Sequence, residues 1–498
     1  MRSKLNFSLL ILLVIVGAFM SVLDTTIVDI IVPKLKGPLS TDIYGVQWVI
    51  TAYMLSAAVA LLLVEWMVKH YGYKWVYIVS VGVFTFSSFL CGISDTLSFI
   101  IFARTIQGFA EAFVMVTAQA LLFSFFPAEK KGIAMGIFAL GVAFAPAVGP
   151  TLGGYLTEYF SWRSVFFVNV PIGILLVIFG SFILPDNAKR EPYSLNIISV
   201  LFLTVFTAAL LIILSKGQQY GWFNSEKIVY LAFISWGGLL AFIISEIFSK
   251  KALFHYPLFK NPYYVLGILI YLFLLGFSMF QYFYLIPLFY EQIKGLSSIQ
   301  TGLGVLGFGI WIGMFSIIAG ILSDKFSPIP VLIIGAVIYL FSAYLISTIN
   351  YYTPFYEAVL KTMPFGIAMG MFFAPITTLV MQNAGKKIEQ AITTMTYVRF
   401  VGASFGTAIA TNNIVFYKNR EFDAMTILQN RDVVQEFLNK LHFYFGMAGN
   451  EVFRMIEQFF SFDYGFKYVW MNAGFWGVVG SVFVFGLIFI RRKNGKNC

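Results

Sequence analysis

The feature that most constrains this chain is a repeated apolar run of about 20 residues, which recurs along nearly its whole length. A run of this length can cross the hydrocarbon core of a bilayer as one helix. Only 11% of the 498 residues are charged, whereas soluble domains carry about 25%. The short alternating segments of about 10 residues that a membrane β-barrel needs are not seen. The pattern predicts an all-α polytopic membrane protein.

Glycine, proline and charged residues divide the apolar runs into 14 predicted transmembrane helices. The first run, Leu5 to Leu23, is longer than the usual signal-peptide core of about 7–15 residues, and no small-residue cleavage motif follows it. We therefore expect it to stay as the first helix. The predicted spans are 8–33, 46–67, 74–93, 97–120, 133–157, 164–184, 194–214, 228–248, 263–288, 299–322, 329–349, 356–381, 391–416 and 468–490.

The distribution of basic residues predicts the orientation in the membrane. Cytoplasmic segments next to membrane spans are enriched in Lys and Arg. With the N-terminus inside, most of these residues fall in the two tails and the even-numbered connections, so both termini are expected in the cytoplasm. The residues on that side are Arg2, Lys4, Lys69, Lys74, Lys130, Lys131, Lys189, Arg190, Lys250, Lys251, Lys260, Lys325, Lys386, Lys387, Arg491, Arg492, Lys493 and Lys496.

The same bias accounts for the formal net charge of +10. A basic balance can indicate nucleic-acid binding, but here the charges lie beside helix ends, so we expect no nucleic-acid partner. Cys91 falls within a span and Cys498 ends the chain, so a disulfide between them is not expected.

The segment 417–467 interrupts the regular spacing of spans on the outer side. Apolar residues recur in it at helical spacing, which predicts two amphipathic helices. Such a pair could rest on the bilayer surface or form a docking surface for an extracytoplasmic partner. The apolar positions are Val434, Phe437, Leu438, Leu441 and Phe445, then Val452, Phe453, Ile456, Phe459 and Phe460.

Two carboxylates lie at the end of the first span. Asp24 and Asp29 are five residues apart, so they project about 140° from each other on a helix. Asp29 is close to Pro33 and the outer boundary, where a solvated acid is the simpler interpretation. Asp24 follows an uncharged stretch, and intramembrane carboxylates usually mark an ion or substrate path. Asp24 is therefore the candidate for function.

The fourth span carries a second polar group, in the stretch RTIQGFAEAF. Arg104, Gln107 and Glu111 follow at i, i+3 and i+7 and share one helical face. Glu111 is too far along the helix for the direct pairing that an i+4 spacing would give. Arg104 is therefore expected to pair with another helix, with Asp24 as a candidate. A structural ion pair and a proton-coupling pair are both compatible with this pattern.

The fifth span contains a stripe of small residues in GVAFAPAVGPTLGGYL. Gly141, Ala145, Gly149 and Gly153 recur every four residues, which allows another helix to approach closely. Pro146 and Pro150 remove backbone donors and predict a kink. The stripe is consistent with tight packing and with a pliable seam between moving bundles. Gly402, Gly406 and Ala410 repeat it more weakly in the thirteenth span.

These motifs resemble those of one family. LDTTIVDIIVPKL resembles the first-helix signature of drug:proton antiporters of the major facilitator superfamily, RTIQG its fourth-helix motif, and GVAFAPAVGPTLGGYL its fifth-helix antiporter motif. WRSVFFVNVPIG, residues 162–173, is similar to a motif of the 14-helix branch. The resemblance extends over nearly the whole chain.

The resemblance implies a fold and a division of the chain. It implies two six-helix bundles with two additional helices between them. The expected regions are an N-terminal bundle at 1–190, two additional helices within 191–255, and a C-terminal bundle at 256–498 that includes the outer segment 417–467.

The resemblance also implies proton-coupled export of amphipathic toxic compounds, without a cofactor beyond the proton gradient. Asp24 would carry the proton, Arg104 would set its pKa, and Glu111 would be a second carrier. The substrate cavity is expected to be aromatic and aliphatic. The residues expected to line it are Gln107, Phe280, Gln281 and Tyr284.

Location and partners follow from the same resemblance. The protein is expected in a bacterial inner membrane, among lipid, with lipophilic small molecules and protons as its ligands. A periplasmic membrane-fusion adaptor and an outer-membrane channel are expected as partners. The alternatives are a carrier of one specific metabolite, in either direction, and a non-transporting receptor. An enzyme or metal site is not expected, because His70, His255 and His442 lie in different loops.

The sequence departs from the family pattern at several positions. After the second helix, Glu65 stands where the family has Gly and Lys69 where it has Asp, which puts the usual charge contact there in doubt. The equivalent loop of the second half keeps Asp324. Asp29 stands where Asn is more usual, and Glu111 is not part of the fourth-helix motif.

Overall fold

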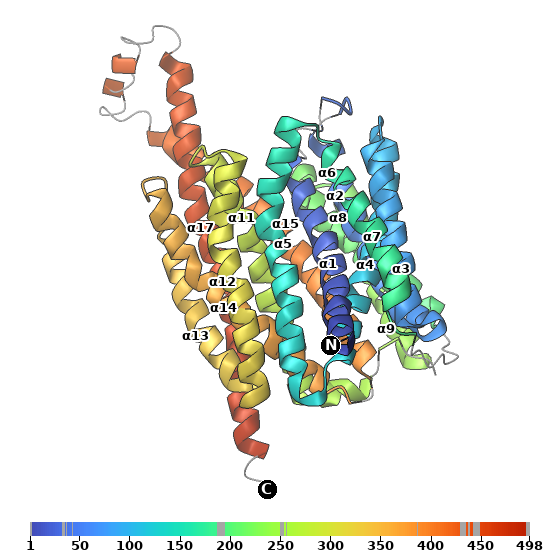
Figure 1. Ribbon diagram of the computed structural model, residues 1–498. Helices are drawn as coiled ribbons and strands as arrows, with labels where there is room; N and C mark the ends of the chain where they lie inside the picture. The colour runs from blue at the N-terminus through green and yellow to red at the C-terminus, as the bar shows by residue number, and fades with distance from the viewer. Residues whose placement is uncertain are drawn as a thin grey trace.

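In the computed structural model, helices occupy most of the described part of each predicted span (Figure 1). The structure describes residues 2–31, 35, 37–41, 43–186, 195–249, 253–254, 256–385, 387–428, 435–436, 439–441 and 449–494, and these residues form no strand. Eleven helices among them are long and apolar enough to cross a membrane, and Trp48–Leu61 and Lys131–Val142 are shorter apolar helices. The fold is an all-α membrane fold, while the number of fourteen crossings stays a prediction.

The main helices are numbered as in Figure 1. They are α1 Arg2–Ile31, α2 Ile43–Leu61, α3 Val64–Gly92, α4 Leu97–Phe125, α5 Lys131–Tyr159, α6 Ser164–Phe167, α7 Asn169–Ile183, α8 Ile197–Tyr220, α9 Glu226–Phe248, α10 Pro262–Ile270, α11 Met279–Gln292, α12 Ser298–Lys325, α13 Pro328–Ser347, α14 Phe355–Gln382, α15 Ile388–Leu428 and α17 Gly449–Asn494. Both chain termini lie at the same end of the molecule (Figure 1). We call this end the terminal side and the opposite end the far side.

Three spans contain internal breaks. The second span continues past α2 into the start of α3 and ends at Gly72, whose φ of 80° suits a glycine. The sixth span is divided between α6 and α7. In the ninth span a π-helical segment, Tyr271–Ser278, joins α10 to α11. Such wide turns often lie at functional sites.

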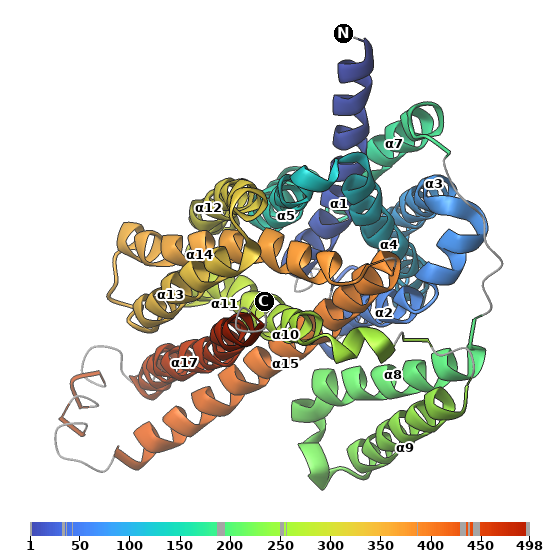
Figure 2. The ribbon, with the colours of Figure 1, turned by 90° about the horizontal axis from the view of Figure 1, so that it is seen from below.

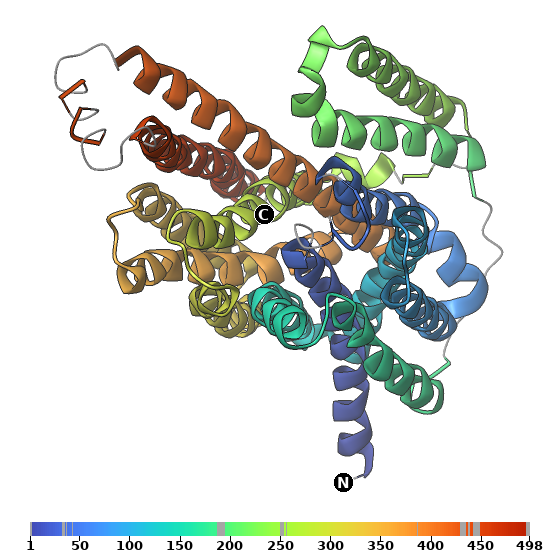
Figure 3. The same ribbon diagram turned by 90° about the horizontal axis from the view of Figure 1, so that it is seen from above.

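The helices form two groups with α8 and α9 beside them (Figures 2 and 3). Helices α1 to α7 pack together, and α10 to α17 form the second group. The most extensive contact between two helices joins α5 to α12, one from each group. Helices α8 and α9 pack mainly on each other, and α8 also contacts α2 and α15. The central space between the groups therefore has two seams, α5–α12 and α2–α15.

The α5–α12 seam is built from close backbone contact. A Cβ atom added at Gly136 would lie 2.5 Å from the Ser316 carbonyl oxygen, and one added at Gly320 would lie 2.3 Å from the Gly132 carbonyl oxygen. The Ser316 hydroxyl donates to the Gly136 carbonyl oxygen at 2.9 Å. Any side chain at these glycines would force the two helices apart.

The predicted small-residue stripe of α5 packs on a different neighbour. A Cβ at Gly141 would lie 2.6 Å from Ile15 Cγ2, and one at Gly149 would lie 2.3 Å from Thr26 Oγ1, both on α1. The expected close packing is confirmed, but its placement between the two bundles was wrong. The glycines that meet the other bundle lie on another face of α5. In the second half, Gly402 approaches Gly276 of the π-helical segment.

On the far side, α15 and α17 continue beyond the neighbouring helices (Figure 1). Residues 452–460, predicted as a separate amphipathic helix, belong to α17 and are continuous with the last span. Most of the other predicted helix, 434–445, lies outside the described residues. Tyr417 and Tyr468 stack with ring centroids 4.8 Å apart, and Asp463 accepts a hydrogen bond from the Tyr351 backbone at 3.0 Å. These contacts tie the base of the extension to the bundle.

Candidate functional site

Asp24 of α1 lies at the centre of a buried polar network. Arg104 Nη1 donates to Asp24 Oδ2, which forms the predicted ion pair. Gln107 Nε2 and Asn169 Nδ2 donate to Asp24 Oδ1 at 3.0 and 2.8 Å. Asp24 has an exposed fraction of 0%. Its two oxygens thus receive donors from α4 and α7, which satisfies a carboxylate in a site without water.

The Arg104 side chain is held by three helices. Its Nη1 also donates to Gln107 Oε1 at 2.8 Å, and its Nε donates to the Val49 carbonyl oxygen at 3.4 Å. The guanidinium carbon lies 3.9 Å from the centre of the Tyr53 ring. Removing one partner of such a buried pair leaves an uncompensated charge, which is strongly destabilising.

Asn169 is a member of this network that the sequence analysis missed. Its Nδ2 also donates to Ser88 Oγ at 3.0 Å, and Ser88 donates to the Phe166 carbonyl oxygen at 2.9 Å. The available signal was an amide inside the apolar stretch WRSVFFVNVPIG. A buried amide needs hydrogen-bond partners, and here it connects α7 and α3 to Asp24.

A cavity between the two groups of helices lies beside this network. The empty space next to its lining residues is about 750 Å³, which includes space open to solvent. Most of its wall is apolar or aromatic. The lining residues are Val22, Thr25, Tyr53, Met54, Glu111 and Val142 from the first group, and Met279, Phe280, Phe283, Ile312, Met369, Phe373, Arg399, Phe400, Ala403 and Ser404 from the second.

Two charged groups face this cavity from opposite groups of helices. Glu111 of α4 and Arg399 of α15 are exposed by only 2% and 5%, and both line the wall. Glu111 Oε2 has no hydrogen-bond partner in the described part of the chain. Arg399 is a second residue that the sequence analysis missed, although an arginine within the predicted span 391–416 was visible. Intramembrane charges usually mark a substrate or ion path.

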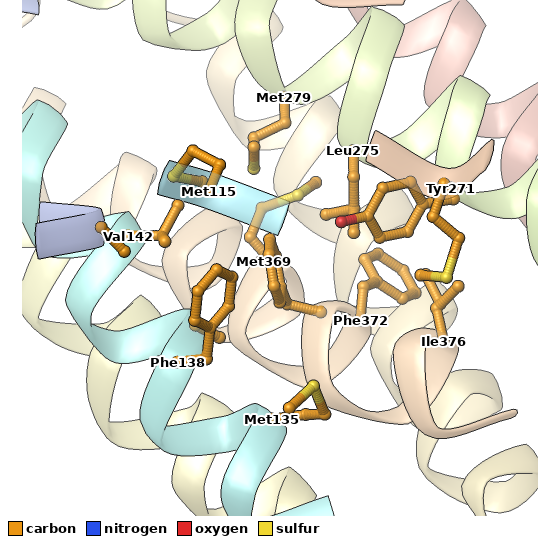
Figure 4. Close-up of a cluster of buried hydrophobic side chains, with 14 of the residues drawn as sticks. Met115, Met135, Phe138, Val142, Tyr271, Leu275, Met279, Met369, Phe372 and Ile376 are labelled. Carbon is orange, nitrogen blue, oxygen red and sulfur yellow. The ribbon is translucent and has the colours of Figure 1, made fainter. Parts of the chain in front are cut away.

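A cluster of buried side chains extends from the cavity wall toward the terminal side (Figure 4). It joins Phe138 of α5 to Phe373 of α14, with ring centroids 6.3 Å apart, and Phe373 to Tyr271 at 6.0 Å. The cluster takes side chains from both groups of helices, so the two groups close against each other at this level. Figure 4 labels Met115, Met135, Phe138, Val142, Tyr271, Leu275, Met279, Met369, Phe372 and Ile376.

A polar contact reinforces this closure at the terminal end of α5. Asp324 of α12 accepts hydrogen bonds from the backbone N–H groups of Gly132 and Ile133, at 2.7 and 2.9 Å. A carboxylate at a helix N-terminus satisfies free donors and complements the helix dipole. In the first half, Lys69 pairs instead with Glu65 one turn away at 2.6 Å. The two loops that correspond to each other in the family therefore make different contacts here.

Of the four residues expected to line the cavity, one lies in its wall. Phe280 lines it. Gln107 does not, because its amide is used by Asp24 and Arg104. Gln281 is fully buried away from the cavity, and its side chain has no hydrogen-bond partner among the described residues. Tyr284, four residues further along α11 than Phe280, is also outside the wall. Gln107, Gln281 and Tyr284 are thus not among the residues that line this cavity, and their role in substrate binding stays a prediction.

The remaining candidates are an acid on α1 and two prolines on α5. The side chain of Asp29 lies outside what the structure describes. Pro146 and Pro150 belong to the continuous helix α5, and a kink there stays a prediction. In the described part of the chain, no three His, Cys, Asp or Glu side chains come together as a metal site would require.

Comparison of the sequence with known protein families identifies the family of this chain. The model of the Major Facilitator Superfamily matches residues 14–407. The chain belongs to the major facilitator superfamily. Among curated relatives, an uncharacterized transporter of this type from Bacillus subtilis, YhcA, is 27% identical over 84% of this chain and 78% of its own length. The multidrug export protein EmrB of Haemophilus influenzae is 29% identical over 83% of this chain and 81% of its own.

A solved structure of the proton:xylose symporter XylE matches with a TM-score of 0.59 at 15% identity, covering 98% of this chain and 96% of that one. This likeness shows the fold alone. Family and fold are those of multi-pass membrane transporters and not of enzymes, and relatives of this chain include multidrug exporters.

Proposed function

We propose that this protein exports amphipathic toxic compounds in exchange for protons across a bacterial inner membrane, with both termini in the cytoplasm. The observation that carries the proposal is Glu111, a buried carboxylate with an unpaired oxygen on the wall of a largely apolar cavity. The basic residues on the terminal side support the orientation. The exporters among the relatives support the direction and substrate type.

The two acids have different surroundings and take different roles in this proposal. Glu111 faces the cavity, where a proton and a substrate can compete for it. Asp24 is enclosed by three donors, so its protonation would release Arg104 from its ion pair. Tyr53 connects the two sites, since its ring lies against Arg104 and it also lines the cavity. Protonation at either acid thereby changes the charges that hold α1, α2 and α4 together.

The proposal is tested in proteoliposomes with an imposed pH gradient. Asp24→Asn and Glu111→Gln should each abolish gradient-driven export of a fluorescent lipophilic dye by protein that is purified in monodisperse form. Asp24→Asn should also lower the unfolding temperature, because it leaves the buried Arg104 without its counter-ion. Asp423→Asn, an exposed acid on α15, is the matched control and should transport normally. Normal gradient-driven export by both site variants would refute the proposed coupling.

We also propose that the far-side extension recruits a periplasmic membrane-fusion adaptor and, through it, an outer-membrane channel. The motivation is the length of α17, Gly449–Asn494, which continues well past the last predicted span. Glu451, Arg454 and Gln458 are exposed along one face of its far end.

The adaptor proposal predicts a separation of two measurements. Arg454→Glu, or deletion of residues 429–448, should remove adaptor co-purification while leaving transport by the isolated exporter in liposomes unchanged. Glu226→Lys, at the start of α9 on the same side, serves as the surface control. Adaptor binding that survives both changes would exclude this docking role.

A further inference from the structure

The cavity wall carries a buried arginine whose charge has no described counter-ion in contact. Arg399 is exposed by only 5%. In the described part of the chain its guanidinium has no hydrogen-bond acceptor or ion-pair partner, and its ring contact is with the adjacent Phe400, at 5.5 Å. A guanidinium has five N–H donors and stays charged. Leaving it buried without an acceptor costs free energy that a bound anion would recover.

The opposite wall carries the complementary group. Glu111 lies within electrostatic reach of Arg399, yet no ion pair joins them in the part of the chain that the structure covers, and Glu111 Oε2 is unpaired. The other charged pair nearby, Asp24 with Arg104, is already neutralised internally. The cavity therefore presents one acid and one base, each from a different half of the molecule.

The rest of the wall is largely apolar. Met54, Met279, Phe280, Phe283 and Phe373 contribute to it. Aromatic and methionine side chains accept flat hydrophobic bodies of variable shape. A ligand with only a positive charge would pair with Glu111 but would be repelled by Arg399. A ligand with only a negative charge would pair with Arg399 but would be repelled by Glu111.

We propose that the central cavity is a site for lipophilic zwitterions, with the cationic end at Glu111 and the anionic end at Arg399. This inference rests on the proposed function, because it names the substrate class of the same cavity. It assigns Arg399 as the residue that distinguishes zwitterions from simple lipophilic cations. The apolar body of the ligand lies against the methionine and aromatic side chains of the same wall.

The proposal has a consequence for exchange with protons. A proton on Glu111 removes the partner of the ligand ammonium, so zwitterion and proton compete, as an exchanger requires. A ligand with only a carboxylate binds better when Glu111 is protonated, because Glu111 then no longer competes for Arg399. The other groups that act on Glu111 are Tyr53 of α2, Asp24 of α1 and Arg104 of α4. Tyr271 of the π-helical segment is the further titratable group near Arg399.

The test uses one fluorescent body in three charge forms. Nε-dansyl-L-lysine is a zwitterion, its methyl ester is a cation, and its Nα-acetyl derivative is an anion. Binding of each to the purified, detergent-solubilised full chain is measured by dansyl fluorescence, without a proton gradient. We expect the zwitterion to bind at least about tenfold more tightly than either derivative, as desolvated charge pairs allow. Its affinity should fall on acidification, whereas that of the anion should rise.

Variants assign the two ends of the ligand. In Arg399→Gln the zwitterion and its methyl ester should bind with about equal affinity. Arg399→Lys should keep part of the preference for the zwitterion. Glu111→Gln should instead remove the preference over the acetylated anion. Arg420→Gln, an exposed arginine on the same helix, is the control and should change neither ratio.

The outcomes separate this inference from the proposed function. A methyl ester that binds as tightly as the zwitterion, an unchanged ratio in Arg399→Gln, or no binding of any form to monodisperse protein would each overturn the inference. Zwitterion preference in detergent together with failure of gradient-driven transport would instead leave the inference standing and refute proton-coupled export.

Discussion

The two seams between the halves of this transporter are built in different ways. At α5–α12 the backbones touch through glycines on both helices, and Asp324 holds the end of α5. At α2–α15 the direct polar contact is a long one, from Ser404 Oγ to Met54 Sδ at 3.8 Å. There α8 bridges the two halves with side chains: Thr207 contacts Tyr397 at 2.5 Å, and Ser215 contacts Thr51 at 3.4 Å.

This difference indicates how each seam can move. Where glycines bring two backbones into direct contact, no side chains lie between the helices. Helices α5 and α12 are therefore suited to rotate or slide against each other while they stay in contact. Side-chain hydrogen bonds can be exchanged one by one, at a cost of about 0.5–1.5 kcal/mol each. We expect the α2–α15 seam, with α8 across it, to separate more readily than α5–α12.

The largest effect is expected from a side chain inserted into the glycine seam. Gly136→Leu should reduce transport to background and destabilise the protein by about 1–3 kcal/mol or more, because overpacking displaces α12. Transport at matched expression and thermal unfolding in detergent are the measurements. Gly237→Leu on α9, where an added Cβ meets nothing within 4 Å, should behave as wild type. Full activity of Gly136→Leu would show that the seam is not closed during transport.

A strong but different effect is expected on the other face of α5. Gly149→Leu should also impair transport, because it pushes on Thr26 of α1, two residues after Asp24. Since this contact lies within one half, an engineered disulfide between α5 and α12 should still form in the variant. Gly149→Ala should be milder, and combining it with Thr26→Ala should restore part of the activity, because it removes the 2.3 Å contact with Thr26 Oγ1 and leaves the 2.9 Å contact with Thr26 Cβ. No rescue by the double change would argue against this contact.

A moderate effect is expected at the polar end of the α5–α12 seam. Asp324→Asn keeps one acceptor but loses the negative charge at the N-terminus of α5, which is worth roughly 0.5–2 kcal/mol. The closed terminal side should therefore open more often. Labelling of Met135→Cys, within the terminal-side cluster, should become about two- to thirtyfold faster at this free-energy change. Asp95→Asn, on the far side with Arg163, should leave labelling unchanged, and equal rates in both variants would contradict the proposed role of Asp324.

The smallest effect is expected at the bridge formed by α8. Thr207→Val removes one hydrogen bond to Tyr397 and should cost about 0.5–1.5 kcal/mol in unfolding free energy, with transport retained. Thr204→Val, on the same helix, is the control for introducing valine. If Thr207→Val abolished transport as completely as Gly136→Leu, the two seams would be equally sensitive and the distinction between them would fail.

The fold could be predicted well from the sequence because the hydropathy and length of a helix depend only on residues that are neighbours in the chain. Apolar runs separated by Gly, Pro and charge identify helices without any tertiary information. The pairing of Asp24 with Arg104 could be predicted as well, since a charge inside a membrane helix needs a partner. Asn169 and Arg399 could have been recognised by the same reasoning applied to every polar residue within a span.

The orientation of helix faces could not be predicted in the same way. Arg104, Gln107 and Glu111 share one face of α4, as their spacing predicts. Their surroundings nevertheless change along that face, because seven residues rise by about 10 Å. Arg104 and Gln107 meet Asp24, whereas Glu111 meets the cavity. Likewise, α5 has two small-residue faces, and only tertiary packing shows which of them meets the other half.

The long helix α17 has a mechanical consequence. Its 46 residues correspond to a rod of about 69 Å, more than twice the thickness of the hydrocarbon core. When the half of the molecule that holds a rigid rod tilts, the far end of the rod moves further than its base. A tilt of about 10° would displace a point 40 Å along a helix of this rise by about 7 Å. A protein attached to the far end of α17 would thus be displaced by more than the 5.4 Å pitch of a helical turn whenever that half tilts by this angle.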